Sequence, residues 1–295
     1  TSQAALDKAR IILFDKSLED VDLDLAGKKS HFIGLTDGDD SIVIGGKAAQ
    51  VVDAGAGDNF VQTGRGDDLV ISGDGDDIVL AGRGNDTIYG GGGADHLSGE
   101  RGDDSIIGGG GDATIDGGSG FDVAVVDGEK ADFHYVGHAW VNSETGDQIA
   151  NVEYTQLSDD SVLITVASDN QAALARLFQA VNNQDPTAAD YKSALVALNN
   201  GDSLEHIAKT MVDKLDGDTD LTAGKLTDAA DKKEFVSQVI DNLFDGSDGA
   251  WNDTAINNYV NSLPNWSKAK IVADLVTKIS AADDHIGIHI DTTTT

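Results

Sequence analysis

The chain has 295 residues, a formal net charge of −32, 35 glycines, two prolines and no cysteine. A charge of this sign repels nucleic acid and anionic lipid, and it attracts hard divalent cations, which take oxygen ligands. The lack of cysteine excludes a disulfide framework and thiolate zinc sites. No apolar run approaches the roughly eighteen residues that a transmembrane helix needs, so we expect no membrane span.

The length suggests two domains, and the chain begins at Thr1 rather than at a methionine. We therefore expect a processed product or a piece of a larger protein. No charged-then-apolar signal peptide precedes the first domain. Residues 1–34 contain an apolar segment, Arg10–Phe14, and the period-two alternation Val21–Leu25, which is typical of strands. We interpret residues 1–34 as an N-terminal β cap that shields the first rung of the structure that follows.

A nine-residue motif fills residues 35–125, with Gly at position 4, Asp at position 6 and an aliphatic residue at position 8. Its clearest copies are Thr63–Ile71, Ser72–Leu80 and Ala81–Tyr89. A short fixed period predicts a stacked solenoid, because no single unit can bury its one aliphatic side chain alone. A disordered Gly/Asp linker is the alternative, but linkers do not carry an aliphatic residue at every ninth position.

Position 4 supplies glycine in nearly every unit, as a loop wrapped around an ion requires, because glycine tolerates positive φ and close backbone approach. Those that we predict to shape metal-binding loops are Gly66, Gly75, Gly84, Gly93 and Gly102. Position 6 supplies the carboxylates: Asp40, Asp68, Asp77, Asp86, Asp95, Asp104 and Asp122. The exceptions at position 6 are Gln50, Asn59 and Ala113, and in the last of these units Asp112 stands one residue early.

These repeats resemble the RTX (repeats-in-toxin) family of bacterial exported proteins. The resemblance implies a right-handed parallel β-roll in which two nonapeptides make one turn. It also implies that Ca²⁺ lies between loops of alternate units, held by Asp carboxylates and loop carbonyls, and that the chain leaves the cell through type I secretion machinery.

Stacking of alternate units predicts which carboxylates share an ion. Four pairs are well formed: Asp68 with Asp86, Asp86 with Asp104, Asp104 with Asp122, and Asp77 with Asp95. The weaker pairs are Asn59 with Asp77, Asp95 with Asp112, and Asp40 with Asn59, whereas Gln50 ends its row. We therefore expect about four strong Ca²⁺ sites and two or three weaker ones.

Two further segments follow the roll. Residues 126–167 hold aromatic-rich strand candidates at Phe133–Val136, Ala139–Val141, Val152–Leu157 and Ser161–Val166, which predict a C-terminal β cap. From Asp169 the apolar period becomes helical, and residues 168–295 are predicted to form about six helices in two copies of a three-helix unit, followed by a C-terminal tail. This arrangement resembles helical domains found beside RTX repeats in bacterial secreted and surface-layer proteins.

Three short motifs favour ordinary structural roles. Arg65–Asp67 and Arg101–Asp103 spell Arg-Gly-Asp, but both fall at positions 3–5 of the repeat. Asp185-Pro186 matches a self-cleavage dipeptide of some RTX proteins, and we interpret Asp185 as a helix N-cap with Pro186 as the first helical residue. The acidic run Asp216–Asp220 lacks the Gly and Glu that an EF-hand needs and predicts a solvated loop.

The overall expectation is a multi-domain β + α protein. We expect the calcium-binding module of a bacterial exported cell-surface protein of surface-layer or adhesin type, which folds on extracellular Ca²⁺ and serves a structural or attachment role. Its expected partners are calcium ions, the type I secretion machinery, further copies of itself, and cell-surface glycan or lipopolysaccharide. No catalytic constellation is evident, so we do not expect an enzyme in this chain. The alternative is the C-terminal module of a secreted protease, lipase or polysaccharide-modifying enzyme whose catalytic domain lies upstream.

Overall fold

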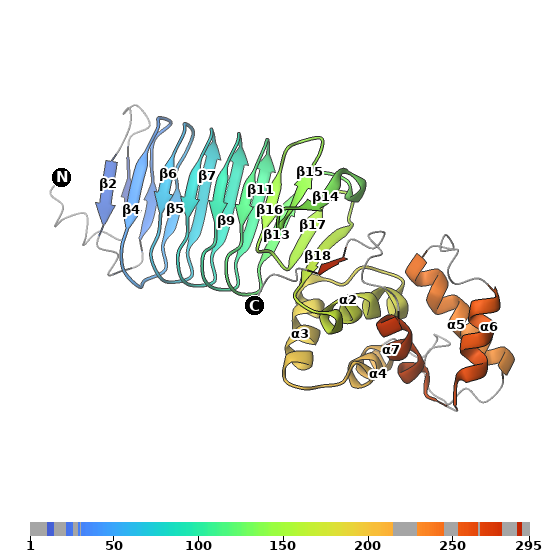
Figure 1. Ribbon diagram of the computed structural model, residues 1–295. Coiled ribbons are helices and arrows are strands. Elements are labelled where there is room, and N and C mark those ends of the chain that lie inside the picture. Colours follow the sequence, from blue (N-terminus) through green and yellow to red (C-terminus); the bar gives the residue numbers. More distant parts are fainter. Residues whose placement is uncertain are drawn as a thin grey trace. The chain divides into compact units, whose positions relative to one another are not determined.

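The computed structural model describes residues 11–14, 22–25, 29, 31–214, 229–244, 253–264, 266–278 and 288–290. The chain forms two compact units, Thr1–Leu163 and Ile164–Thr295. The first is a parallel β-solenoid of about six turns, and the second contains six helices (Figure 1). The motif Asp216–Asp220 lies outside the described residues.

Successive strands of the solenoid alternate between two sheets, so that each turn contributes one strand to each sheet (Figure 1). The first sheet contains β1 (Ile11–Leu13), β3 (Phe32–Gly34), β5 (Val51–Asp53), β7 (Leu69–Asp74), β9 (Thr87–Gly92), β11 (Ser105–Gly110), β13 (Val123–Val126), β17 (Tyr154–Leu157) and β18 (Val162–Val166), where β18 runs across the boundary between the units. The second contains β2 (Asp22–Leu25), β4 (Ser41–Ile44), β6 (Phe60–Gln62), β8 (Ile78–Leu80), β10 (His96–Ser98), β12 (Thr114–Asp116), β16 (Gln148–Ala150), β15 (Ala139–Asn142) and β14 (Phe133–Val136).

Strands pair in parallel and in register with the strand one full turn away, so that Val70 lies beside Ile88 and Val61 beside Val79. The register aligns equivalent repeat positions, which confirms that two nonapeptides make one turn. The aliphatic residues of position 8 fill the space between the sheets, and each is at most 1% exposed: Ile42, Val52, Val61, Val70, Val79, Ile88, Leu97, Ile106, Ile115 and Ala124. The core is therefore one narrow column of position-8 side chains, with smaller position-1 side chains such as Ala54 and Ala81 beside it.

The strands found within residues 1–34 belong to this same stack. β1 pairs with β3 and β2 pairs with β4, both in parallel, and Ile12 and Leu23 join the core column. The described strands of residues 1–34 thus continue the parallel stacking of the solenoid beyond the nonapeptide repeats.

At the other end an antiparallel hairpin closes the second sheet. β14 pairs with β15 and β15 with β16 in antiparallel fashion, whereas β16 still pairs in parallel with β12. A short helical turn, η1 (Lys130–Asp132), leads into β14. Trp140 is 5% exposed and packs edge-on against Tyr135 with ring centroids 5.3 Å apart. These aromatic side chains cover the last aliphatic layer of the core.

The second unit contains helices α2 (Asp169–Asn182), α3 (Ala188–Asn199), α4 (Leu204–Lys214), α5 (Ala229–Phe244), α6 (Asp253–Ser262) and α7 (Lys268–Lys278). In order, 14, 12, 11, 16, 10 and 11 residues of these helices are described. A short strand, β19 (Ile288–Ile290), pairs with residues 164–166 of β18. No described helix is long and apolar enough to cross a membrane.

Two buried polar side chains of the helical unit form hydrogen bonds within it. The Tyr259 hydroxyl donates to Asp274 Oδ2 at 2.7 Å, and Lys232 Nζ donates to the Leu263 carbonyl at 3.3 Å. Helix α3 begins differently from the sequence-based expectation, because its N-cap is Thr187, whose hydroxyl accepts the Asp190 amide. Asp185 is therefore not the cap, and its carboxylate instead accepts a hydrogen bond from the Gln179 side-chain amide.

Position-4 glycines are required by both conformation and space. Gly102 has φ of 135°, and a Cβ placed on it would lie 1.6 Å from the carbonyl oxygen of Gly84. We predict that Gly102→Ala destabilises the calcium-loaded solenoid by about 2 kcal/mol or more, since the residue must leave its backbone region and push two turns apart. Urea unfolding followed by circular dichroism measures this loss.

The matched control is Gly110→Ala. A Cβ on Gly110 meets no atom within 4 Å, and Gly110 is not among the residues with positive φ. This variant is expected to unfold at the same urea concentration as the wild type. Equal losses in both variants would contradict the steric account.

Candidate metal centre

The position-6 residues form two rows along the solenoid, one for each set of alternate units. The Asp68 row contains Gln50, Asp68, Asp86, Asp104 and Asp122, and the Asp77 row contains Asp40, Asn59, Asp77, Asp95 and Ala113. Each acid of these rows is at most 2% exposed. The structure thus places the acids predicted from the sequence side by side in the predicted order, apart from Asp112.

A ladder of hydrogen bonds joins each row. The backbone amide of each residue donates to the carboxylate Oδ1 of the acid 18 residues later. The donor–acceptor distances are 2.7 Å for Asp68 to Asp86, 2.7 Å for Asp86 to Asp104, 2.8 Å for Asp104 to Asp122 and 3.0 Å for Asp77 to Asp95. These four connections are the four pairs that the sequence singles out as well formed.

The second oxygen of each of these acids has no partner. Oδ2 is buried without a hydrogen bond in Asp68, Asp77, Asp86, Asp95, Asp104 and Asp122. A buried, unpartnered carboxylate oxygen is costly in the ionised form, so a protein compensates it with a cation or keeps it protonated. Six such atoms, repeated at one position of a stacked motif, indicate a row of cation sites.

Backbone carbonyls converge on the same places. A Cβ built on Gly90 would lie 2.7 Å from Asp95 Oδ2 and 2.5 Å from the carbonyl oxygen of Gly108 in the next turn. Two oxygens that both lack a proton repel each other unless a positive group lies nearby. Oxygen-only sites of carboxylates and carbonyls suit Ca²⁺. No group of three or more acidic or histidine side chains that could hold a metal gathers within the described residues, so a cation bound here would need carbonyl ligands beside the carboxylates.

Burial raises the pKa of these acids. The pKa of Asp86 and of Asp122 rises to about 7, and that of Asp95 to about 6, chiefly because burial penalises the charged form. Backbone hydrogen bonds partly oppose this rise, while neighbouring carboxylates of the same row add to it. The metal-free rows therefore hold protons near neutral pH that a bound cation would displace.

Where the row carries an amide, the amide itself supplies the positive group. Asn59 Nδ2 donates to the carbonyl of Gly57 at 2.9 Å and reaches the carbonyl of Ser72 in the next turn at 3.5 Å. Gln50 Nε2 likewise donates to the carbonyls of Ala48 and Lys29. These N–H groups satisfy loop carbonyls that have no such donor where the row carries an aspartate.

The remaining sequence candidates lie elsewhere. The Asp40 carboxylate accepts hydrogen bonds from both the amide and the hydroxyl of Thr36, which satisfies it without a cation. Asp112 is exposed, and a Cβ on Gly146 would lie 3.3–3.4 Å from its carboxylate. It does not extend the Asp77 row, in which the amide of Ala113 donates instead to Asp147 Oδ1 at 2.8 Å.

A second ladder of position-5 residues runs along the outside of the loops in the opposite direction. Asp67 Oδ1 accepts the amide of Asn85, and Asn85 Oδ1 accepts the amide of Asp103, each at 2.9 Å and each from the following turn. Asp67 and Asn85 are exposed, and Asp103 is half-buried. Asp67 and Asp103, the acids of the two Arg-Gly-Asp tripeptides, therefore serve the repeat as structural acceptors.

Comparison with known proteins agrees with this geometry. The family description "RTX calcium-binding nonapeptide repeat (4 copies)" matches residues 53–88 and again residues 89–124. Searches of curated proteins and of solved structures found no match. The chain thus contains RTX calcium-binding nonapeptide repeats that form a β-solenoid, and such repeats are typical of exported bacterial proteins.

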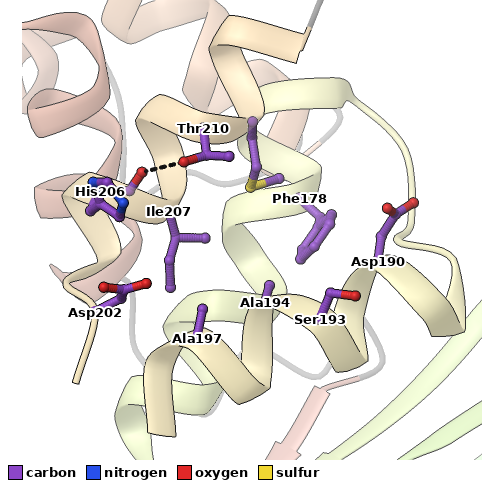
Figure 2. Close-up of a pocket in the computed structure, with 10 residues that line it drawn as sticks. Phe178, Asp190, Ser193, Ala194, Ala197, Asp202, His206, Ile207 and Thr210 are labelled. Atoms are coloured by element: carbon purple, nitrogen blue, oxygen red, sulfur yellow. Dashed lines mark hydrogen bonds between the residues drawn. The ribbon is translucent and has the colours of Figure 1, made fainter. Parts of the chain in front are cut away.

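A separate pocket of about 460 Å³ lies between α2, α3 and α4 in the helical unit (Figure 2). Buried Phe178 and Ile207 line it together with Ala194, and Asp190 and His206 stand among its exposed residues. The hydroxyl of Ser193, which also lines the pocket, donates to the Ala189 carbonyl at 2.8 Å. The pocket combines an apolar wall with an acidic margin, which is a common setting for ligand binding.

The raised pKa values predict that acid stabilises the calcium-free solenoid. The folded-state pKa of Asp86 and Asp122 is about 7, against 3.8 when unfolded, so the folded form binds more protons. This contribution is complete below about pH 4 and is lost as the pH rises through 7. In calcium-stripped buffer the urea midpoint should therefore be higher at pH 5.5 than at pH 8. With saturating Ca²⁺ the dependence should reverse, because protons compete with the metal; a pH-independent midpoint in both conditions would contradict the prediction.

A second prediction concerns the amide in the Asp77 row. Asn59→Asp removes the side-chain amide that donates to the Gly57 carbonyl and puts a buried carboxylate in its place. We expect the calcium-free protein to lose about 1–3 kcal/mol of stability, and the calcium-loaded protein to bind one additional ion. Urea unfolding and native mass spectrometry measure the two effects.

Asn85→Asp is the matched control, because Asn85 is exposed and acts only as an acceptor for the Asp103 amide. A carboxylate can replace it there, as Asp67 and Asp103 show. Neither stability nor calcium count should change. An unchanged calcium count in Asn59→Asp would refute the role assigned to the amide.

Proposed function

We propose that this chain is the calcium-folded module of a bacterial exported protein, with a structural or attachment role at the cell surface. The observation that carries the proposal is the set of six buried Oδ2 atoms without a hydrogen bond, stacked at one repeat position. The RTX repeats and the net charge of −32 support the same interpretation. Ca²⁺ would neutralise the carboxylates, and the chain's own residues would orient them.

The proposed switch follows from mass action. Extracellular calcium modules have Kd values of about 10⁻⁴–10⁻³ M. At about 1 mM calcium and a Kd of about 0.1 mM, each site adds about 1.4 kcal/mol to the folded state. Four to six sites add about 6–8 kcal/mol, which is comparable with the whole stability of a domain. At cytosolic calcium this contribution vanishes, which suits export of a loosely folded chain.

The finer role is structural. A rigid solenoid followed by a helical unit with its own pocket suits a protein that presents or anchors that unit in a surface layer or adhesin. Its proposed partners are further copies of itself or a surface glycan. The secreted-enzyme alternative requires a catalytic domain upstream of Thr1, and the sequence of the parent gene decides between them.

Calcium titration tests the switch. We predict that far-UV circular dichroism of the chelator-treated chain gains a strand signal between about 0.1 and 1 mM Ca²⁺. Asp86→Asn, which alters the middle of the longer row, should shift the midpoint to higher calcium. The exposed control Asp67→Asn keeps its acceptor oxygen and should leave the midpoint unchanged. A spectrum that does not respond to calcium would overturn the proposed function.

Light scattering tests the surface-layer form of the proposal. We expect the calcium-loaded chain to assemble into larger particles and the chelated chain to remain monomeric. A monomer at every calcium concentration argues for the isolated-module alternative, in which the chain serves a larger secreted enzyme.

A further inference from the structure

The end of the Asp68 row carries an acid that lies outside the repeats. The backbone amide of Asp122 donates to Glu153 Oε2 at 2.8 Å, as the amide of Asp104 donates to Asp122 Oδ1 at 2.8 Å. Glu153 therefore occupies the position-6 place of the next turn. It lies beyond residues 89–124, the last stretch that matches the RTX family.

The register explains why the sequence hides this equivalence. Gly117 donates its amide to Ala150, and Val123 pairs with Tyr154. The chain thus needs only three residues, 151–153, for a corner that takes six residues, 117–122, in the turn before. This shorter corner interrupts the nine-residue spacing, so the repeat pattern does not extend to Glu153. The extra methylene of glutamate suits the shortened corner, because it lengthens the reach of the carboxylate.

The oxygens around this end match those around Gly90 in the Asp77 row. A Cβ on Gly117 would lie 2.9 Å from Asp122 Oδ2 and 2.3 Å from the carbonyl oxygen of Asn151. On Gly90 the corresponding distances are 2.7 Å to Asp95 Oδ2 and 2.5 Å to the Gly108 carbonyl. Asp122 is fully buried, and its Oδ2 has no hydrogen-bond partner. A buried carboxylate oxygen without a hydrogen bond and a carbonyl oxygen thus lie on the same side of Gly117.

We propose that Asp122 and Glu153, with the Asn151 carbonyl, form a further Ca²⁺ site that joins the last repeat to the closing strands. This inference rests on the proposed calcium function and extends it beyond the repeats. The site couples the hairpin end of the solenoid to the same cation that orders the loops.

The experiment counts calcium ions by native mass spectrometry at about 1 mM free Ca²⁺, a concentration that fills extracellular-type sites. Glu153→Gln should bind one ion fewer than the wild type and remain folded, because its amide supplies protons to the oxygens as Asn59 does. Glu144→Gln is the matched control, since Glu144 is exposed in the same closing hairpin. It should retain the wild-type count.

A second pair of variants decides the question if Glu153→Gln fails to fold. Under this proposal Asp122→Asn removes a ligand from two sites, those shared with Asp104 and with Glu153. Asp68→Asn removes a ligand from one site only, because Gln50 ends the row on that side. Asp122→Asn should therefore lose two ions and Asp68→Asn one. Equal losses from these two variants, or a wild-type count in folded Glu153→Gln, overturn the terminal site.

The failure of the broader function would look different. If the repeats bind no calcium, the wild type itself carries no ions and Asp86→Asn changes nothing. If the repeats bind calcium and the terminal site does not exist, Asp86→Asn loses two ions while Glu153→Gln loses none. The two outcomes are therefore distinguishable in one set of measurements.

Discussion

The solenoid depends on how it resolves the repulsion between buried oxygens. At Gly90 and at Gly117, a position-6 carboxylate oxygen and a backbone carbonyl of the next turn both lie close to the glycine, away from water. Two such oxygens repel each other unless a positive group lies nearby. Two chemical solutions are open to this chain: the cation that we propose between carboxylates, or the N–H groups of an amide. Under this proposal, the choice of Asp or Asn at one position decides which turns depend on metal.

The hydrogen-bond ladders give each loop a direction. Position-6 carboxylates accept from the preceding turn, while position-5 side chains accept from the following turn. Each loop is thereby tied to both neighbours through side chains as well as strands. The inner ladder requires compensation of buried charge, whereas the outer one lies in water and requires none. Calcium thus acts on the inner ladder, while the outer ladder fixes loop geometry at little electrostatic cost.

The sequence predicts most of the solenoid because its signal is periodic. A fixed spacing places Val70 over Ile88 and Asp68 over Asp86 without knowledge of anything else. Where periodicity ends, prediction weakens. The sequence does not predict that Glu153 stands at a position-6 place, because the shortened corner before it breaks the nine-residue period. The equivalence becomes visible only in the structure, where Tyr154 pairs with Val123. The sequence-based prediction for Asp112 is wrong because a residue one place before position 6 does not point its side chain into the row.

The unequal ends of the two rows bear on how such a protein changes length in evolution. The Asp68 row meets Glu153 at its last turn, and the Ala113 position meets Asp147. Loss of one nonapeptide would join each row to the wrong terminus and exchange the two sheets. Loss or gain of an eighteen-residue pair preserves both junctions and alters the rod by one strand spacing, about 4.8 Å. Duplication and deletion in this gene are therefore constrained to even numbers of repeats, so that the rod lengthens or shortens only in whole turns.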